Sequence, residues 1–124
     1  MWGTGLYIKS CYEFELMEKL SKSIKNVSES LFVEIKREKA KNLILGCVYR
    51  QHTPISTFVS EYLKNALNSI NSKPNKMCIL MGDFNMDLLK CSIKTPSRDF
   101  YDLCSFSFRP LILQASRVTS KTAT

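Results

Sequence analysis

The sequence is poor in residues that break regular structure, and it lacks the spacings of a zinc site or a disulfide framework. Glycine and proline number only 4 each, which excludes collagen-like and low-complexity chains. The 5 cysteines are an odd number without a Cys-x-x-Cys pair, and there is 1 histidine. No apolar run approaches the roughly 18 residues that span a bilayer, and the first residues do not resemble a secretion signal. We therefore expect an intracellular domain, nuclear or cytoplasmic and not secreted, that has no contact with a membrane.

The composition is that of one basic globular domain. Hydrophobic residues make up 44% and charged residues 23% of the chain, which favours a packed core over disorder. At 124 residues the chain has room for a single domain, residues 1–124. Lysine and arginine outnumber acidic residues by 18 to 11, and the net charge of +7 suits a polyanion such as nucleic acid. Because the bases are spread evenly along the chain, solvated surface lysines are the alternative explanation.

Apolar stretches predict most of the strands. They lie at residues 5–9, 31–35, 43–49 and 77–81, with a last strand starting at residues 111–113. The apolar residues of the stretch 43–49 do not alternate with polar ones, which predicts a strand covered on both faces, and 77–81 is predicted to be buried as well. Cys47 and Cys78 lie inside these two runs and are expected to be small core residues. Residues 12–20 fit a helix or a strand equally well.

One helix is predicted with particular clarity. Between residues 55 and 70, apolar side chains recur at the i, i+3, i+4, i+7 spacing. Thr53 is expected to cap this helix with Pro54 at its first position, and residues 71–74 to end it. A shorter helix is predicted after Ser97, carrying Phe100, Leu103 and Cys104. The order of these elements indicates a layered α/β domain.

The most informative motif is Gly-Asp-Phe-Asn at residues 82–85, directly after a predicted strand. Gly82 permits a sharp exit from the strand, and Asp83 and Asn85 then offer two oxygen-bearing side chains two residues apart. Such oxygens suit Mg²⁺ or can orient a water for attack on phosphorus. An EF-hand loop is excluded, because Leu88 and Lys94 occupy its required Gly and Glu positions. The alternative is an Asx turn that only ends the strand.

A second polar loop follows the strand 43–49. Tyr49 ends this run and is followed by Arg50 and the single histidine, His52. A phenol near a phosphate can donate a hydrogen bond to a developing charge. The alternatives are a strand-end aromatic residue for Tyr49 and a solvated loop residue for His52. The bases that flank the acidic loop and could contact phosphates are Lys90, Lys94, Arg109 and Arg117.

Taken together, these motifs resemble the endonuclease/exonuclease/phosphatase superfamily, and specifically the endonuclease domain of non-LTR retrotransposon polyproteins. Five landmarks occur in the family's order: the Gly-rich strand at 3–8, the strand at 31–35, the Tyr-bearing strand at 46–50, the Gly-Asp-Phe-Asn signature within 78–85, and Ser-Arg-Val-Thr at 116–119. The resemblance covers essentially the whole chain.

The resemblance implies a four-layer α/β sandwich that uses Mg²⁺ or Mn²⁺ to hydrolyse phosphodiester bonds in DNA. Asp83 would activate or orient the attacking water, and Asn85 would help to hold the scissile phosphate or the metal. Tyr49 would stabilise the transition state or the leaving group. Arg117 and Thr119 would lie beside the DNA.

The resemblance also implies elements that this sequence does not contain. A first strand with an Asn and a metal-binding Glu would precede residue 3, and an Asp and a closing Asp-His pair would follow residue 124. We therefore expect an internal fragment, truncated at both ends and without its first and last strands, from a polyprotein with a reverse transcriptase. By itself it is expected to have no appreciable nuclease activity, because such groups act as a unit.

Two other functions stay open at this point. The same superfamily includes phosphatases of small phosphorylated molecules, which activity on a sugar phosphate or inositol phosphate would reveal. A non-catalytic nucleic-acid-binding remnant would instead show salt-sensitive binding that survives the loss of Asp83 and Tyr49.

Overall fold

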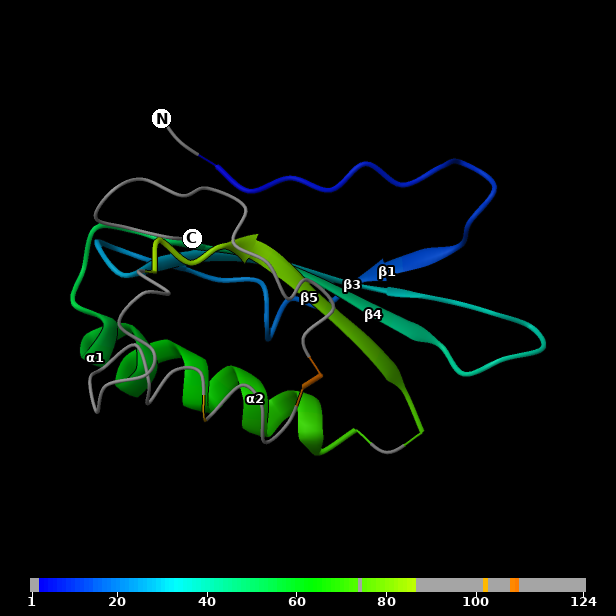
Figure 1. Ribbon diagram of the computed structural model, residues 1–124. Helices are drawn as coiled ribbons and strands as arrows, with labels where there is room; N and C mark the ends of the chain where they lie inside the picture. The colour runs from blue at the N-terminus through cyan, green and yellow to red at the C-terminus, as the bar shows by residue number, and fades with distance from the viewer. Residues whose placement is uncertain (1–2, 74, 87–101, 103–107, 110–124) are drawn as a thin grey trace.

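The fold is a mixed β-sheet with one long helix packed against one of its faces (Figure 1). The computed structural model describes residues 3–73, 75–86, 102 and 108–109. This is an α/β arrangement, as the sequence predicts. The predicted helix after Ser97 and the predicted strand starting at 111–113 lie outside the described residues, apart from the isolated Asp102.

Within the described residues the sheet has five strands, in the order β1-β3-β4-β5, with β2 also paired to β3. The strands are β1 (Phe14–Leu16), β2 (Ser23–Ile24), β3 (Ser28–Ile35), β4 (Leu43–Arg50) and β5 (Met77–Asp83). All pairings are antiparallel except the one between β4 and β5, which are parallel and joined through the helix. The predicted strands at 31–35, 43–49 and 77–81 are confirmed, with β3 beginning three residues earlier than predicted.

The predicted helix is confirmed over its whole length, but its cap is not. It runs without a break through α1 (Ile55–Phe58), a π-helical turn η1 (Val59–Leu63) and α2 (Lys64–Asn71). The residue at the cap position is Pro54, whose side chain makes no capping hydrogen bond. The prediction that Thr53 is the N-cap is therefore wrong by one residue. The carbonyl oxygen of Thr53 instead accepts a hydrogen bond from Arg50.

The core lies between the helix and one face of the sheet. Phe58, Leu63 and Leu67 of the helix are buried against Ile44 and Val48 of β4 and their neighbours. Alternate residues of β4 face the helix, as the strand period of two requires. Sheet and helix thus exclude water from each other, which is the main stabilising contribution in a domain of this size.

The opposite face of the sheet is only partly covered, which corrects two sequence predictions. Every second residue of β4, including Cys47, is half-buried instead of buried. Met77 and Met81 of β5 are exposed, with fractional exposures of 51% and 40%, so β5 is not a buried strand. Cys78 faces the core, and its burial raises the pKa of this thiol to about 11.

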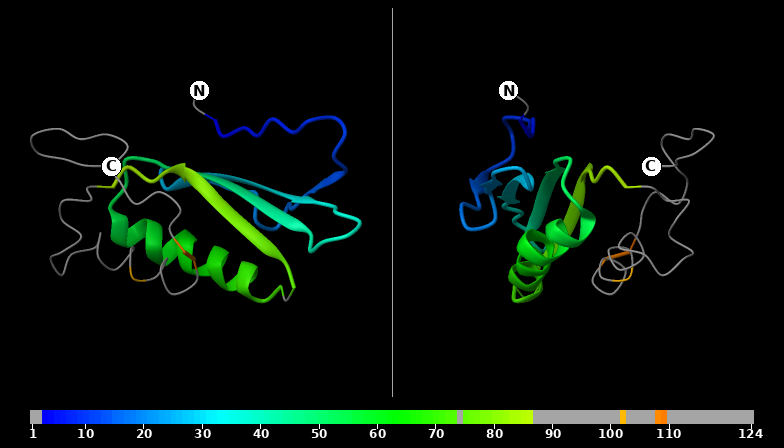
Figure 2. Two further views of the ribbon diagram at one scale, coloured as in Figure 1. Left: turned by 45° about the vertical axis from the view of Figure 1, so that its right-hand side comes forward. Right: turned by 90° about the vertical axis from the view of Figure 1, so that its left-hand side faces the viewer.

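The segment before β1 is extended but is not a strand. Residues 3–9 pass on the side of the sheet away from the helix (Figures 1 and 2). Thr4, Leu6 and Ile8 are half-buried while the residues between them are exposed. No ladder forms with the described strands, so the prediction of a strand at 5–9 is wrong. The ambiguous stretch 12–20 contains β1.

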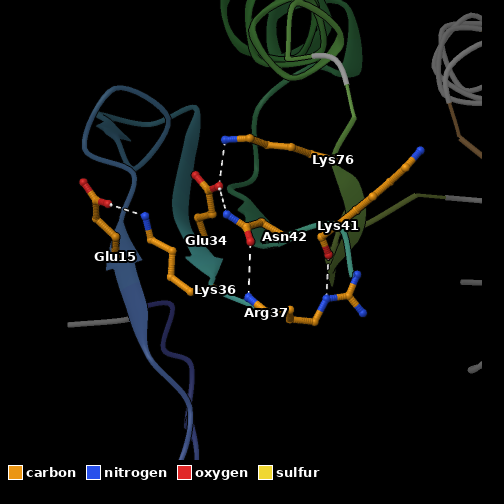
Figure 3. A network of polar contacts seen from close by, with 7 residues as sticks. All are labelled: Glu15, Glu34, Lys36, Arg37, Lys41, Asn42 and Lys76. Carbon is orange, nitrogen blue, oxygen red and sulfur yellow. Dashed lines mark hydrogen bonds and ion pairs between the residues drawn. The ribbon is translucent and has the colours of Figure 1, made fainter. Parts of the chain in front are cut away.

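A polar network joins the starts of β4 and β5 to the end of β3 (Figure 3). The Glu34 carboxylate accepts a hydrogen bond from the Asn42 side chain at 2.9 Å and pairs with the Lys76 ammonium at 2.7 Å. The Asn42 carbonyl accepts from the Met77 N–H at 3.1 Å. These contacts lower the pKa of Glu34, through Lys76 first and Asn42 second. The network stabilises one end of the sheet, and the polar loops after β4 and β5 lie at the other end.

Candidate functional site

Tyr49 and Asp83 are direct neighbours on adjacent strands. The parallel pairing of β4 with β5 sets Tyr49 opposite Asp83, at the carboxyl ends of both strands. Both residues alternate with core-facing neighbours and therefore lie on the sheet face away from the helix. Neighbouring strands are about 4.8 Å apart, so the two side chains stand side by side. The two polar loops that the sequence marks as candidate sites therefore begin side by side, at the same end of the sheet.

Glu29 extends this pair into a row across three strands. The antiparallel pairing of β3 with β4 places Glu29 opposite Tyr49, and Glu29 is half-buried. The phenol therefore lies between two residues that carry carboxylates. The sequence did not reveal Glu29 as a site residue, because only the register between β3 and β4 brings it there. No local signal in the sequence marks Glu29, because its neighbours Ser28 and Ser30 are also polar although both are buried on the helix side.

Gly82 is required by the close approach of β5 to β4. Its φ is +151°, a conformation that other residues rarely adopt. A Cβ atom at this position would lie 1.8 Å from the carbonyl oxygen of Val48, its partner in the ladder. Only glycine therefore permits this backbone to place the next residue, Asp83, beside Tyr49.

The residues after Gly82 form an Asx turn. One carboxylate oxygen of Asp83, Oδ1, accepts a hydrogen bond from the Asn85 backbone N–H at 2.9 Å. The Asn85 side-chain amide donates to the carbonyl oxygen of Arg50 at 2.9 Å, and Asn85 adopts a left-handed φ of 48°. The Asx turn that the sequence offered as an alternative to a metal site is therefore present. It leaves Asp83 Oδ2 and Asn85 Oδ1 without a hydrogen-bond partner among the described residues.

Arg50 ties this turn to the loop that precedes the helix. Its side chain is only 7% exposed, and its Nε donates to the Phe84 carbonyl at 2.5 Å. The two terminal nitrogens donate to the carbonyls of Thr53 and Asn85. Burial lowers the pKa of Arg50, and the nearby Asp83 carboxylate opposes that shift. In the sequence, Arg50 stands out only as the neighbour of Tyr49.

Two further residues named from the sequence lie at the surface of the part that the structure describes. His52 is exposed in the loop after β4, and Arg109 is exposed. Arg117, Thr119, Lys90 and Lys94 lie outside the described residues.

A hard divalent cation needs oxygen ligands, and the turn after β5 offers two. Asp83 and Asn85 supply one carboxylate and one amide oxygen with no competing hydrogen bond, and Asp83 is exposed. Mg²⁺ is commonly held by one or two carboxylates while it keeps several waters, so these residues fit it. Within residues 3–73, 75–86, 102 and 108–109, no three His, Cys, Asp or Glu side chains are grouped to hold a metal ion.

No protein-family model matches the sequence, and no curated protein or solved structure is found to be similar to it. In the part of the chain that the structure describes, no helix has the length and apolar character needed to cross a membrane. The geometry of the site must therefore carry any functional assignment.

Proposed function

We propose that the chain carries part of a metal-dependent phosphodiesterase site that acts on nucleic acid, in a domain of the endonuclease/exonuclease/phosphatase type. The observation that supports this most strongly is the pairing of Tyr49 with Asp83 at the carboxyl ends of two parallel strands. A phenol and a carboxylate side by side on this partly covered face can serve a phosphate ester, because one donates a hydrogen bond and the other accepts a proton. The net charge of +7 favours a polyanionic substrate.

The residues have distinct roles in this proposal. Asp83 activates or orients the attacking water. The Tyr49 hydroxyl donates a hydrogen bond to the oxygen on which charge develops. Asp83 and Asn85 would hold Mg²⁺ or Mn²⁺, which supplies charge neutralisation for the phosphoryl oxygens when bound. Arg117 and Thr119 are proposed to lie beside the DNA.

The proposal extends to the fold and its context. The sheet with its one helical layer is proposed to be half of a four-layer α/β sandwich, in a polyprotein that also carries a reverse transcriptase. The partly covered sheet face, with its exposed Met77 and Met81, supports a second layer there.

Manganese binding tests the site directly. Mn²⁺ is added to the ¹⁵N-labelled full chain, and paramagnetic broadening is followed by NMR. We expect the first signals to broaden at Asp83 and Asn85, and the effect to be lost in Asp83→Asn, which keeps the acceptor of the turn. Glu38→Gln is the matched control, because Glu38 is an exposed carboxylate in the turn between β3 and β4. Broadening that is equal at all exposed carboxylates would refute the site.

Substrate assays separate the competing functions. Nicking of supercoiled plasmid that requires the metal and Asp83 would support a DNA phosphodiesterase. It would also overturn the expectation that this chain is inactive by itself. Turnover of an inositol phosphate or sugar phosphate without DNA cleavage would favour a phosphatase. DNA binding that weakens with salt and survives both Asp83→Asn and Tyr49→Phe would instead favour a non-catalytic binding module.

A further inference from the structure

The buried guanidinium of Arg50 joins the two loops at the candidate site. It leaves β4 on the helix side of the sheet, beneath the face that carries Tyr49 and Asp83. Among the described residues, its side chain donates to three main-chain carbonyls, one in the loop before the helix and two in the turn after β5. The carbonyl of Arg50 also accepts from the Asn85 side chain. Arg50 therefore contacts the turn through both its side chain and its backbone.

We propose that Arg50 is a positioning residue that fixes the turn holding Asp83 and Asn85 against the end of β4, through its fork of hydrogen bonds to the carbonyls of Phe84, Asn85 and Thr53. The expected effect of Arg50 on metal binding rests on the proposed function. The structural part of the inference, the fixing of the turn, can be tested separately. Arg50 itself is not assigned a contact with substrate or metal.

The chemistry of the guanidinium explains why arginine is needed at this position. Its planar fork donates in several fixed directions at once, whereas a lysine ammonium is a compact point charge on a flexible stem. The three carbonyls lie on two segments separated by about thirty residues of chain, which the fork spans. Without the fork, the turn would keep the packing of Phe84 near Phe58, with ring centroids 6.4 Å apart, but would lose its polar ties. Groups around a metal site commonly act by orienting the ligands in this way.

The test compares Arg50→Met and Arg50→Lys with the wild-type full chain. The first readout has two parts, hydrogen exchange at the Asn85 backbone N–H and the NMR shift of the Asn85 side-chain amide. The side-chain amide donates to the main-chain carbonyl of residue 50, which every variant retains. The second readout is the Mn²⁺ affinity from broadening at Asp83. Arg37→Met is the matched control, because Arg37 Nε also donates to a main-chain carbonyl, that of Lys41 at 2.6 Å, at the opposite end of the sheet.

We expect Arg50→Met to lose protection at Asn85 and to bind Mn²⁺ about tenfold or more weakly. Arg50→Lys should behave like Arg50→Met, since charge alone does not replace the fork. Arg37→Met should match the wild type at Asn85 even if it lowers overall stability. If Arg50→Met does not fold, Arg50→Lys, which keeps the charge and stem, gives the same comparison.

Two results would overturn the proposal. One is unchanged Asn85 exchange and Mn²⁺ affinity in a folded Arg50 variant, and the other is full recovery by lysine. Failure of the proposed function has a different signature, because wild-type chain would then bind no Mn²⁺ at Asp83. In that event, Asn85 exchange alone decides whether Arg50 positions the turn.

Discussion

The contact between Gly46 and Phe32 gives a quantitative test of the register between β3 and β4. The two residues face each other across the strands, and Phe32 is completely buried. A Cβ atom added at Gly46 would lie 2.3 Å from Cε1 of the Phe32 ring and 2.8 Å from two further ring atoms. Carbon atoms pack at about 3.5–4.0 Å. The ring would therefore have to move by more than about 1 Å in a core that has no room for it.

We expect Gly46→Ala to lower the free energy of unfolding by about 1–3 kcal/mol, the usual effect of overpacking. The nearest atoms all belong to the Phe32 ring, so a smaller side chain there should relieve the clash. Phe32→Leu alone should cost less than the about 3–5 kcal/mol typical of Phe→Ala. In the double variant the two losses should not add, and we expect a favourable coupling energy of about 1–2 kcal/mol.

Urea unfolding followed by circular dichroism measures all four proteins of this cycle. Gly5→Ala is the control, because nothing lies within 4 Å of a Cβ atom at that position. Its effect should stay within about 0.5 kcal/mol. Strict additivity, or a Gly46→Ala variant as stable as Gly5→Ala, would refute the register. Glu29 would then no longer lie beside Tyr49.

Three further predictions follow from single residues. Gly82→Ala should destabilise the chain by more than the about 1–2 kcal/mol cost of a left-handed residue, because its Cβ also meets the Val48 carbonyl; equal stability by urea unfolding would refute the β4–β5 register. Glu34 has a lowered pKa in the folded state, so it stabilises the fold above its ordinary value of 4.5, and this stabilisation is lost as the pH falls through the lowered value. In Glu34→Gln, the free energy of unfolding should therefore fall less steeply as the pH is lowered. An unchanged pH dependence would contradict the ion pair and hydrogen bond assigned to Glu34. Burial raises the pKa of Tyr62 to about 12, with the Ser30 hydroxyl opposing the shift, yet the Tyr62 hydroxyl makes no hydrogen bond of good geometry among the described residues. Tyr62→Phe should keep or raise the melting temperature, and a large drop would reveal a missed partner.

Local patterns in the sequence were sufficient for much of the fold. The helix follows from apolar residues at the helical period, and its buried positions, such as Phe58, Leu63 and Ile70, are those that the pattern predicts. Residues 43–49 and 77–81 were identified as strands from their apolar character alone. The sequence predicted that both strands are covered more fully than they are. An apolar run indicates which side chains can be buried, but it does not indicate whether another layer packs against each face of the strand.

In the candidate site too, the local turn could be predicted from the sequence, whereas the long-range contacts could not. Glycine, carboxylate and amide at 82, 83 and 85 are recognisable along the chain, because the turn they form is local and closes over two residues. The pairing of Asp83 with Tyr49 depends on β4 and β5, which are neighbours in the sheet but are separated along the chain by the helix that connects them. The role of Arg50 depends on carbonyl groups, which every residue carries, so the residue types gave no sign of it.

The sequence by itself determined the long helix and the three longest strands, and which residue types end the two central strands, because those properties depend on neighbours a few residues apart. Only the tertiary structure decided that Glu29, Tyr49 and Asp83 form one row and that a buried arginine ties the turn in place. Strand register and long-range hydrogen bonds are fixed by the packing of the whole sheet against its helix. No local spacing encodes them.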